Sequence, residues 1–146
     1  MSEKKGESKV EEPTLYYAVD VEKKGAGFEY PTIQVGYAHS TSIDVKPVSG
    51  SFCFNYAKVP FEPKCHKEFW SKNLDIYARI FAEAKGKDPV EEWKKYAASL
   101  DKLEEKHDKI EIVSDNPAYD IEAVDYHLFK DANHIGKGAL PPPTVL

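Results

Sequence analysis

The stretch Leu15-Tyr16-Tyr17-Ala18-Val19-Asp20-Val21-Glu22 decides the expected fold. Its near-continuous apolar run predicts a strand that is covered on both faces. Because residues i and i+2 of a strand point to the same face, the carboxylates of Asp20 and Glu22 point into the same space. Two like charges held so close repel each other, and either water or a cation must offset that repulsion. The pair therefore indicates either a solvated strand end or a site for a hard divalent cation such as Mg²⁺.

The composition is typical of one soluble globular domain. The chain has 146 residues, of which 41% are hydrophobic and 31% charged, and no apolar run approaches the roughly 18 residues that a membrane span needs. The formal net charge of -5 argues against tight, sequence-independent binding of long nucleic acid, but not against an enzyme that meets phosphates through metal ions. Cys53 and Cys65 are too few and too far apart for a zinc site. We expect both thiols to be reduced, in an intracellular, cytoplasmic compartment.

Three segments of different character follow one another along the chain. Residues 1–13 are polar and rich in Lys and Glu, which predicts a disordered leader. Residues 14–133 carry regular apolar patterns and form the expected domain. Residues 134–146, which include Pro141-Pro142-Pro143, predict an irregular tail without a further regular element. Within the domain we expect strands over residues 14–21, 32–38, 51–57 and 109–113, and helices over residues 73–85, from Asp88 onward, and over residues 118–130.

Periodicity and cap residues support these elements. Phe52, Phe54 and Tyr56 alternate on one face of the third expected strand. Gly86 suits the end of the first helix, and Asp88-Pro89-Val90-Glu91 is typical of the start of the second. The expected buried faces are Leu74, Tyr77, Ala78 and Phe81; then Trp93, Tyr96, Ala97, Leu100 and Leu103; then Ile121, Val124 and Leu128. The order of elements predicts an α/β fold whose mixed sheet begins with three antiparallel strands.

A second group of acids follows the fourth expected strand, in Ser114-Asp115-Asn116-Pro117-Ala118-Tyr119-Asp120. Asp115 or Asn116 before Pro117 is good capping chemistry, and Asp120 in the first turn gains from the helix dipole, so a purely structural role explains them too. If the first and fourth strands are neighbours, their carboxyl ends share an edge of the sheet. Asp120 would then lie near Asp20 and Glu22, and the three carboxylates would make a divalent-metal site.

These residues amount to a resemblance over roughly residues 14 to 130. Val19-Asp20-Val21-Glu22, followed after a Gly turn by Ile33-Gln34-Val35-Gly36, resembles the first motif of the ribonuclease H-like 3'-5' exonucleases, the superfamily named for its Asp-Glu-Asp-Asp acids. Asn116-Pro117-Ala118-Tyr119-Asp120 resembles its second motif. Residues 61–72 also resemble a segment of exonucleases of large DNA viruses. The fold that the resemblance implies is a ribonuclease H-like mixed sheet.

The resemblance also implies a mechanism and a substrate. Two Mg²⁺ or Mn²⁺ ions would activate a water and stabilise the leaving oxygen of a phosphodiester at the 3' end of DNA or RNA. Asp20 would contact both ions, Glu22 the ion on the side of the nucleophile, and Asp120 the other ion. Asn116, Tyr119 and Lys23 are the expected substrate contacts, and Lys24 is a further candidate for a phosphate.

One departure from the family pattern leaves alternatives open. Family members carry a third motif, a final Asp preceded by a His or Tyr on a last helix, and this chain reaches Leu146 without it. His127 and His134 are imidazoles that no pattern brings to the metals. We therefore expect a C-terminally incomplete exonuclease, a short relative with weakened catalysis, or an inactive module that binds nucleic acid or protein. A homodimer could supply a missing edge strand.

Overall fold

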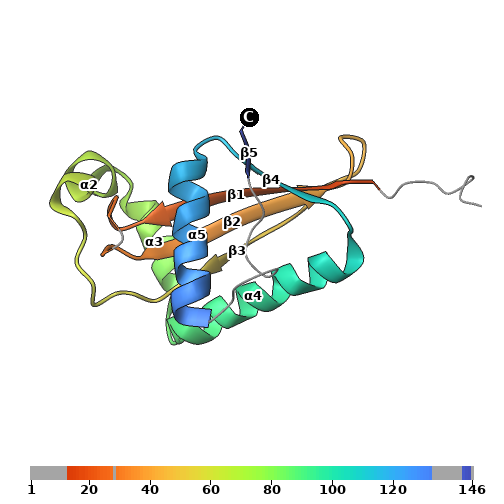
Figure 1. The fold of residues 1–146 in the computed structure, drawn as a ribbon. Coiled ribbons are helices and arrows are strands. Elements are labelled where there is room, and N and C mark those ends of the chain that lie inside the picture. Colours follow the sequence, from red (N-terminus) through yellow and green to blue (C-terminus); the bar gives the residue numbers. More distant parts are fainter. Residues whose placement is uncertain (1–12, 28, 133–142, 146) are drawn as a thin grey trace, which may run out of the picture.

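A mixed five-stranded sheet forms the centre of the fold (Figure 1). The computed structural model describes residues 13–27, 29–132 and 143–145. The strand order is β3-β2-β1-β4-β5, in which β1 pairs antiparallel with β2 and parallel with β4. The strands are β1 (Leu15–Lys23), β2 (Thr32–Ser40), β3 (Val48–Cys53), β4 (Ile110–Ser114) and β5 (Pro143–Val145). The mixed α/β sheet, its antiparallel three-strand start and the neighbouring positions of β1 and β4 are confirmed.

The sheet differs from expectation at two strands. Pro143–Val145 form β5, parallel to β4, where an irregular tail was expected. Proline lacks only the backbone N–H, so it is tolerated at the first position of an edge strand. β3 begins at Val48 and ends at Cys53, earlier than expected. The alternating Phe54 and Tyr56 still pack on the core, but the backbone has left the sheet before them.

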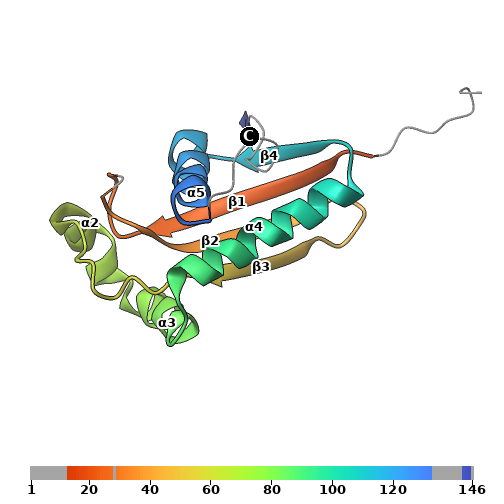
Figure 2. The same ribbon diagram turned by 60° about the horizontal axis from the view of Figure 1, so that its bottom comes forward.

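Two helices, α4 (Pro89–Lys106) and α5 (Pro117–Ala132), cover one face of the sheet (Figure 2). Their apolar faces meet the alternate side chains Tyr17, Val19 and Val21 of β1 in one buried cluster. Along the ranges that the structure describes, no helix combines the length and apolar character that crossing a membrane requires. The predicted faces of both helices are confirmed, with Trp93, Tyr96, Ala97, Leu100, Ile121, Val124 and Leu128 buried and Leu103 partly buried.

A helical segment caps the end of the sheet where β1 finishes (Figures 1 and 2). It contains α2 (Pro63–Glu68), the 3₁₀ turn η1 (Trp70–Lys72) and α3 (Leu74–Ala84). The expected buried face of α3 is wrong, because Leu74 is 63% exposed and Phe81 39% exposed. Ile80 and Ala84 are buried instead, against Ile33, Cys53 and Trp70. As expected, Gly86 follows the helix with a positive φ of 79°, a conformation that suits glycine.

A buried polar network joins the two covering helices to the start of β2. The Thr32 N–H donates to Nε2 of His127 over 3.2 Å, which makes Nδ1 the protonated nitrogen that donates to Asp131 over 2.6 Å. Tyr56 O–H donates to the same carboxylate and accepts a hydrogen bond from Nε1 of Trp93. Burial lowers the pKa of His127, in agreement with a neutral ring.

We expect Trp93→Ala to lower the free energy of unfolding by about 3–5 kcal/mol, because it opens a cavity and removes a stacked ring. The Trp93 ring is fully buried and lies 3.9 Å from Phe54 and 4.6 Å from His127 between ring centroids. Urea denaturation measures the change. Phe129→Ala is the matched control, since Phe129 is 64% exposed and its loss should change stability by no more than about 0.5 kcal/mol. Equal losses in the two variants would contradict this core.

Candidate functional site

Asp20 and Glu22 lie where one edge of β1 loses its neighbouring strand. β4 pairs with β1 only as far as Ala18, while β1 itself continues to Lys23. The two acids are therefore inside a strand that remains paired with β2, and not beyond its end. Asp20 is exposed and Glu22 half-buried, both on the face opposite the core side chains of β1.

Asp120 of α5 occupies the edge that β4 leaves free. Its Oδ1 accepts a hydrogen bond from the backbone N–H of Val21 over 3.3 Å, and its Oδ2 accepts one from the Ser114 hydroxyl over 2.7 Å. The side chain is only 2% exposed. Val21 stands between Asp20 and Glu22 in the strand, so the structure brings Asp120 to the position that the order of elements predicted.

The pKa values of all three carboxyl groups are raised, in each case first by burial. The pKa of Glu22 rises to about 7, first because of burial and then because of the charges of Asp20 and Asp120. Burial and the neighbouring Asp115 raise the pKa of Asp20. Burial also raises the pKa of Asp120, and the Ser114 hydroxyl opposes that rise. Negative charge therefore concentrates at this edge, in partly dry surroundings where it is costly.

Two of the three predicted substrate contacts line one hollow, and the third, Asn116, is not part of its lining. Lys23 and Tyr119 line a hollow of about 230 Å³ between the turn after β1 and the start of α5. The Lys23 ammonium donates to the carbonyls of Ala26 and Gly27 and lies 5.5 Å from the centroid of the Tyr119 ring. Asn116 is exposed, and its carbonyl accepts the N–H groups of Tyr119 and Asp120, which starts the helix.

Lys24 cannot contact a phosphate as expected, because its ammonium is enclosed. The residue is 2% exposed, and its Nζ donates to the carbonyl oxygens of Tyr56 over 2.7 Å and of Val59 over 2.6 Å. His127 belongs to the core network described above, and His134 lies outside the described residues.

Sequence reasoning missed the part that Ser114 and Asp115 play. Ser114 was considered only as a residue before a helix, yet its hydroxyl holds Asp120 and also accepts the N–H of Asn116 over 3.1 Å. Asp115 is the charged neighbour that most raises the pKa of Asp20. A serine six residues before an acid carries no recognisable signal, because the contact depends on how the chain turns between β4 and α5.

The carboxylates supply the ligand atoms of a divalent-metal site without forming a complete cluster. Among the side chains that the structure describes, no three Asp, Glu, His or Cys residues form a group that could hold a metal ion. Asp120 is fixed by its two hydrogen bonds, whereas Asp20 and Glu22 are accessible enough to rotate. The negative charge of this arrangement can concentrate cations at the edge of β1.

The fold is similar to that of exonuclease I from E. coli, in the metal-free form of its complex with single-stranded DNA. The TM-score is 0.53 at 15% identity, and the match covers 80% of this chain and 23% of the exonuclease chain. This likeness shows that the matched parts of the two chains share a mixed α/β fold. No protein-family model and no curated protein matches the sequence.

We expect Glu22 to make stability fall as the pH rises through neutrality. Its pKa is about 7 in the folded chain against an ordinary value of 4.5, so between these values the folded state binds more protons than the unfolded state. That contribution is fully present below about pH 4.5 and is lost as the pH rises through about 7. Glu22→Gln should therefore gain stability relative to wild type between pH 5 and pH 7.5, measured by urea denaturation in EDTA across that range; parallel curves would contradict the shift.

We expect Asp120→Ala to cost about 1–3 kcal/mol of unfolding free energy, because it leaves the Val21 N–H without its partner. Asp120→Asn is the matched variant, since its amide oxygen can still accept from Val21 and its amide nitrogen can donate to Ser114. It should retain most of the stability while removing the charge. Thermal and urea denaturation of both variants measure the difference, and an equal loss in both would show that the charge, and not the hydrogen bonds, holds this edge.

Proposed function

We propose that the chain is a metal-dependent nuclease of the 3'-5' exonuclease type, which hydrolyses phosphodiester bonds at the 3' end of a nucleic acid. The observation that carries the proposal is the hydrogen bond from the Val21 N–H, between Asp20 and Glu22 in β1, to the carboxylate of Asp120, together with a pKa of about 7 for Glu22. The likeness of the fold to exonuclease I supports it. Because the match spans 23% of that chain, the activity remains a proposal for this protein.

The chemistry of the donor set fits Mg²⁺ or Mn²⁺. Both ions prefer carboxylate oxygens, and carboxyl groups whose pKa values are raised by burial and by neighbouring acids are stabilised in their charged form when a cation lies beside them. Asp20 would contact two ions, Glu22 the ion on the side of the nucleophile, and Asp120 the other. When bound, the ions supply an activated water and stabilise the leaving oxygen.

The three carboxylates differ in how firmly the structure holds them. Asp120 is held by Val21 and Ser114, so it sets the position of the negative charge. Asp20 and Glu22 have exposed faces and can turn toward a bound ion. With a pKa of about 7, Glu22 gives up its proton readily at neutral pH when a cation approaches.

The hollow beside the acids is the proposed place of the terminal nucleotide. The Tyr119 ring forms one wall and offers a face on which a base can stack. Lys23 also lines the hollow; it is 5% exposed, and its ammonium would contact a phosphate oxygen by giving up its hydrogen bond to the carbonyl of Ala26 or Gly27. The scissile phosphate would then lie over Asp20 and Glu22, one residue away along β1.

A second candidate function is a binding module without catalysis. The observation in its favour is that, within the part of the chain that the structure describes, no three acids or imidazoles form a group able to hold a metal ion. Such a module would bind a nucleic-acid 3' end through Lys23 and Tyr119 and release no nucleotide.

We expect Mn²⁺-dependent release of mononucleotides from a 5'-labelled single strand, and a loss of at least about 100-fold in rate for Asp20→Asn or Glu22→Gln. Denaturing gel electrophoresis with DNA and RNA oligonucleotides measures the release. Asp44→Asn is the control, because Asp44 is an exposed acid in the connection between β2 and β3. Cleavage that survives in Asp20→Asn would point to a contaminating nuclease. Binding of the 3' end without release would favour the binding module.

A further inference from the structure

The segment between β3 and α4 differs in charge from the rest of the chain. Residues 58–87 contain seven Lys and Arg against four Asp and Glu, a formal charge of +3, whereas the other residues together carry -8. All seven cationic side chains are exposed. Lys58, Lys64, Lys67 and Lys85 are among them, and none of these four forms an ion pair within the part of the chain that the structure describes.

A row of aromatic rings runs through the same segment, from α2 to α3. The ring centroids of His66 and Phe61 are 5.6 Å apart, those of Phe61 and Tyr77 5.0 Å, and those of Tyr77 and Phe81 6.2 Å. His66 and Phe81 are exposed, and Phe61 and Tyr77 are half-buried. The row is therefore open to solvent along part of its length, although its inner rings pack on Trp70.

The exposed lysines lie close in sequence to the residues of this row. Lys64 and Lys67 lie on α2 on either side of His66, and Lys85 is one helical turn beyond Phe81. Lys58 lies in the connection whose carbonyl oxygens, from Tyr56 and Val59, hold Lys24.

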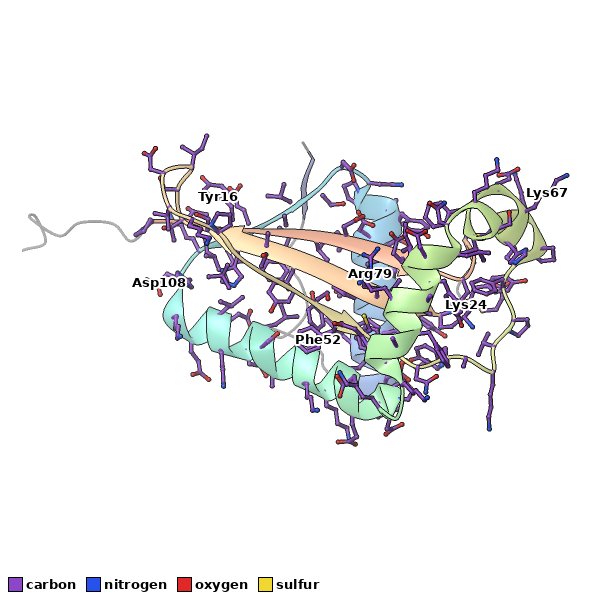
Figure 3. All side chains as sticks on the ribbon, turned by 180° about the vertical axis from the view of Figure 1, so that it is seen from behind. Tyr16, Lys24, Phe52, Lys67, Arg79 and Asp108 are labelled. Atoms are coloured by element: carbon purple, nitrogen blue, oxygen red, sulfur yellow. The ribbon has the colours of Figure 1, made fainter. Side chains whose placement is uncertain are left out.

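The segment is anchored directly after the acids of β1. The Lys24 ammonium lies 4.8 Å from the centroid of the Phe61 ring, just before α2, and 5.6 Å from that of the Tyr77 ring in α3; Lys24 is labelled in Figure 3. The Glu62 N–H donates to the Lys24 carbonyl over 2.9 Å, and the Trp70 indole N–H donates to the Lys23 carbonyl over 3.0 Å. Lys24 is two residues beyond Glu22, roughly 7 Å along an extended chain.

We propose that this segment, residues 58–87, is a platform for single-stranded nucleic acid upstream of the 3' end held at the acids; the inference rests on the proposed function. Its rings would stack on unpaired bases, and its lysines would neutralise the phosphates between them. A duplex hides its base faces in its own stack, so the combination of rings and cations fits a single strand. A chain with a negative net charge can then bind a polyanionic substrate, because its excess positive charge is confined to a segment next to the acids.

Binding measured in EDTA tests the platform without cleavage. The probe is a 5'-fluorescein oligo(dT) of 15 nucleotides, followed by fluorescence anisotropy at several salt concentrations. We expect the triple variant Lys64→Gln, Lys67→Gln, Lys85→Gln to reduce the slope of log K against log salt by about 2, because each phosphate contact on a single strand contributes about 0.7. Phe81→Ala should weaken binding by about five-fold or more through the loss of one stacked base.

Matched variants distinguish binding at the platform from a general effect of the net charge of the chain. Lys46→Gln, Lys102→Gln, Lys106→Gln changes the net charge equally, on exposed residues outside the segment, and should leave the slope unchanged. Phe129→Ala removes an exposed phenylalanine from α5 and should leave the affinity unchanged. The proposal would be overturned if the two triple variants changed the salt slope equally, or if Phe81→Ala bound the single strand as tightly as the wild type does. It would also be overturned if Phe81→Ala weakened binding of a duplex of the same length by the same factor. Failure of the proposed function shows separately, as absence of Mn²⁺-dependent release by the wild-type chain.

Discussion

The carboxylate of Asp120 is the constraint on which the arrangement of this end of the fold depends. Where β4 stops pairing with β1, the Val21 N–H would face an empty edge, and the side chain of a helix replaces the missing strand. The same carboxylate takes the Ser114 hydroxyl, so one group fixes the end of β4, the edge of β1 and the start of α5. The cost is that a further negative charge lies near Glu22, where it adds to the effects of burial and of Asp20 that together raise the pKa of Glu22 to about 7.

Much of this fold could be predicted because its elements carry strong local signals. α4 and α5 are amphipathic helices with clear start residues, and β1 is a long apolar run. Their buried faces can therefore be predicted from the spacing of their apolar residues alone. The position of Asp120 at the edge of the strand that carries Asp20 and Glu22 followed from topology, since a parallel pairing of β1 and β4 leaves their carboxyl ends at one edge.

The remaining features depend on contacts that no local pattern records. α3 has two apolar stripes of the same period, and packing on Trp70 and Ile33 selects the stripe with Ile80 and Ala84. The enclosure of Lys24 depends on carbonyl oxygens more than thirty residues away. β5 was missed because prolines indicate a loop, whereas an edge strand tolerates them. The hydrogen bonds of Asp120 likewise arise from a turn whose path only the folded chain defines.

Each of the two buried clusters of the fold contains one of the two tryptophans, so each has its own fluorescent residue. Trp93 is buried in the cluster between the sheet and α4 and α5, and Trp70 in the separate cluster of α2, η1 and α3. The chain has only these two, so the intrinsic fluorescence of a single-tryptophan chain reports on one cluster alone. The surroundings of the helical segment beside the acids and those of the sheet that carries them can therefore be followed by separate signals, which would show whether the two loosen together or one before the other.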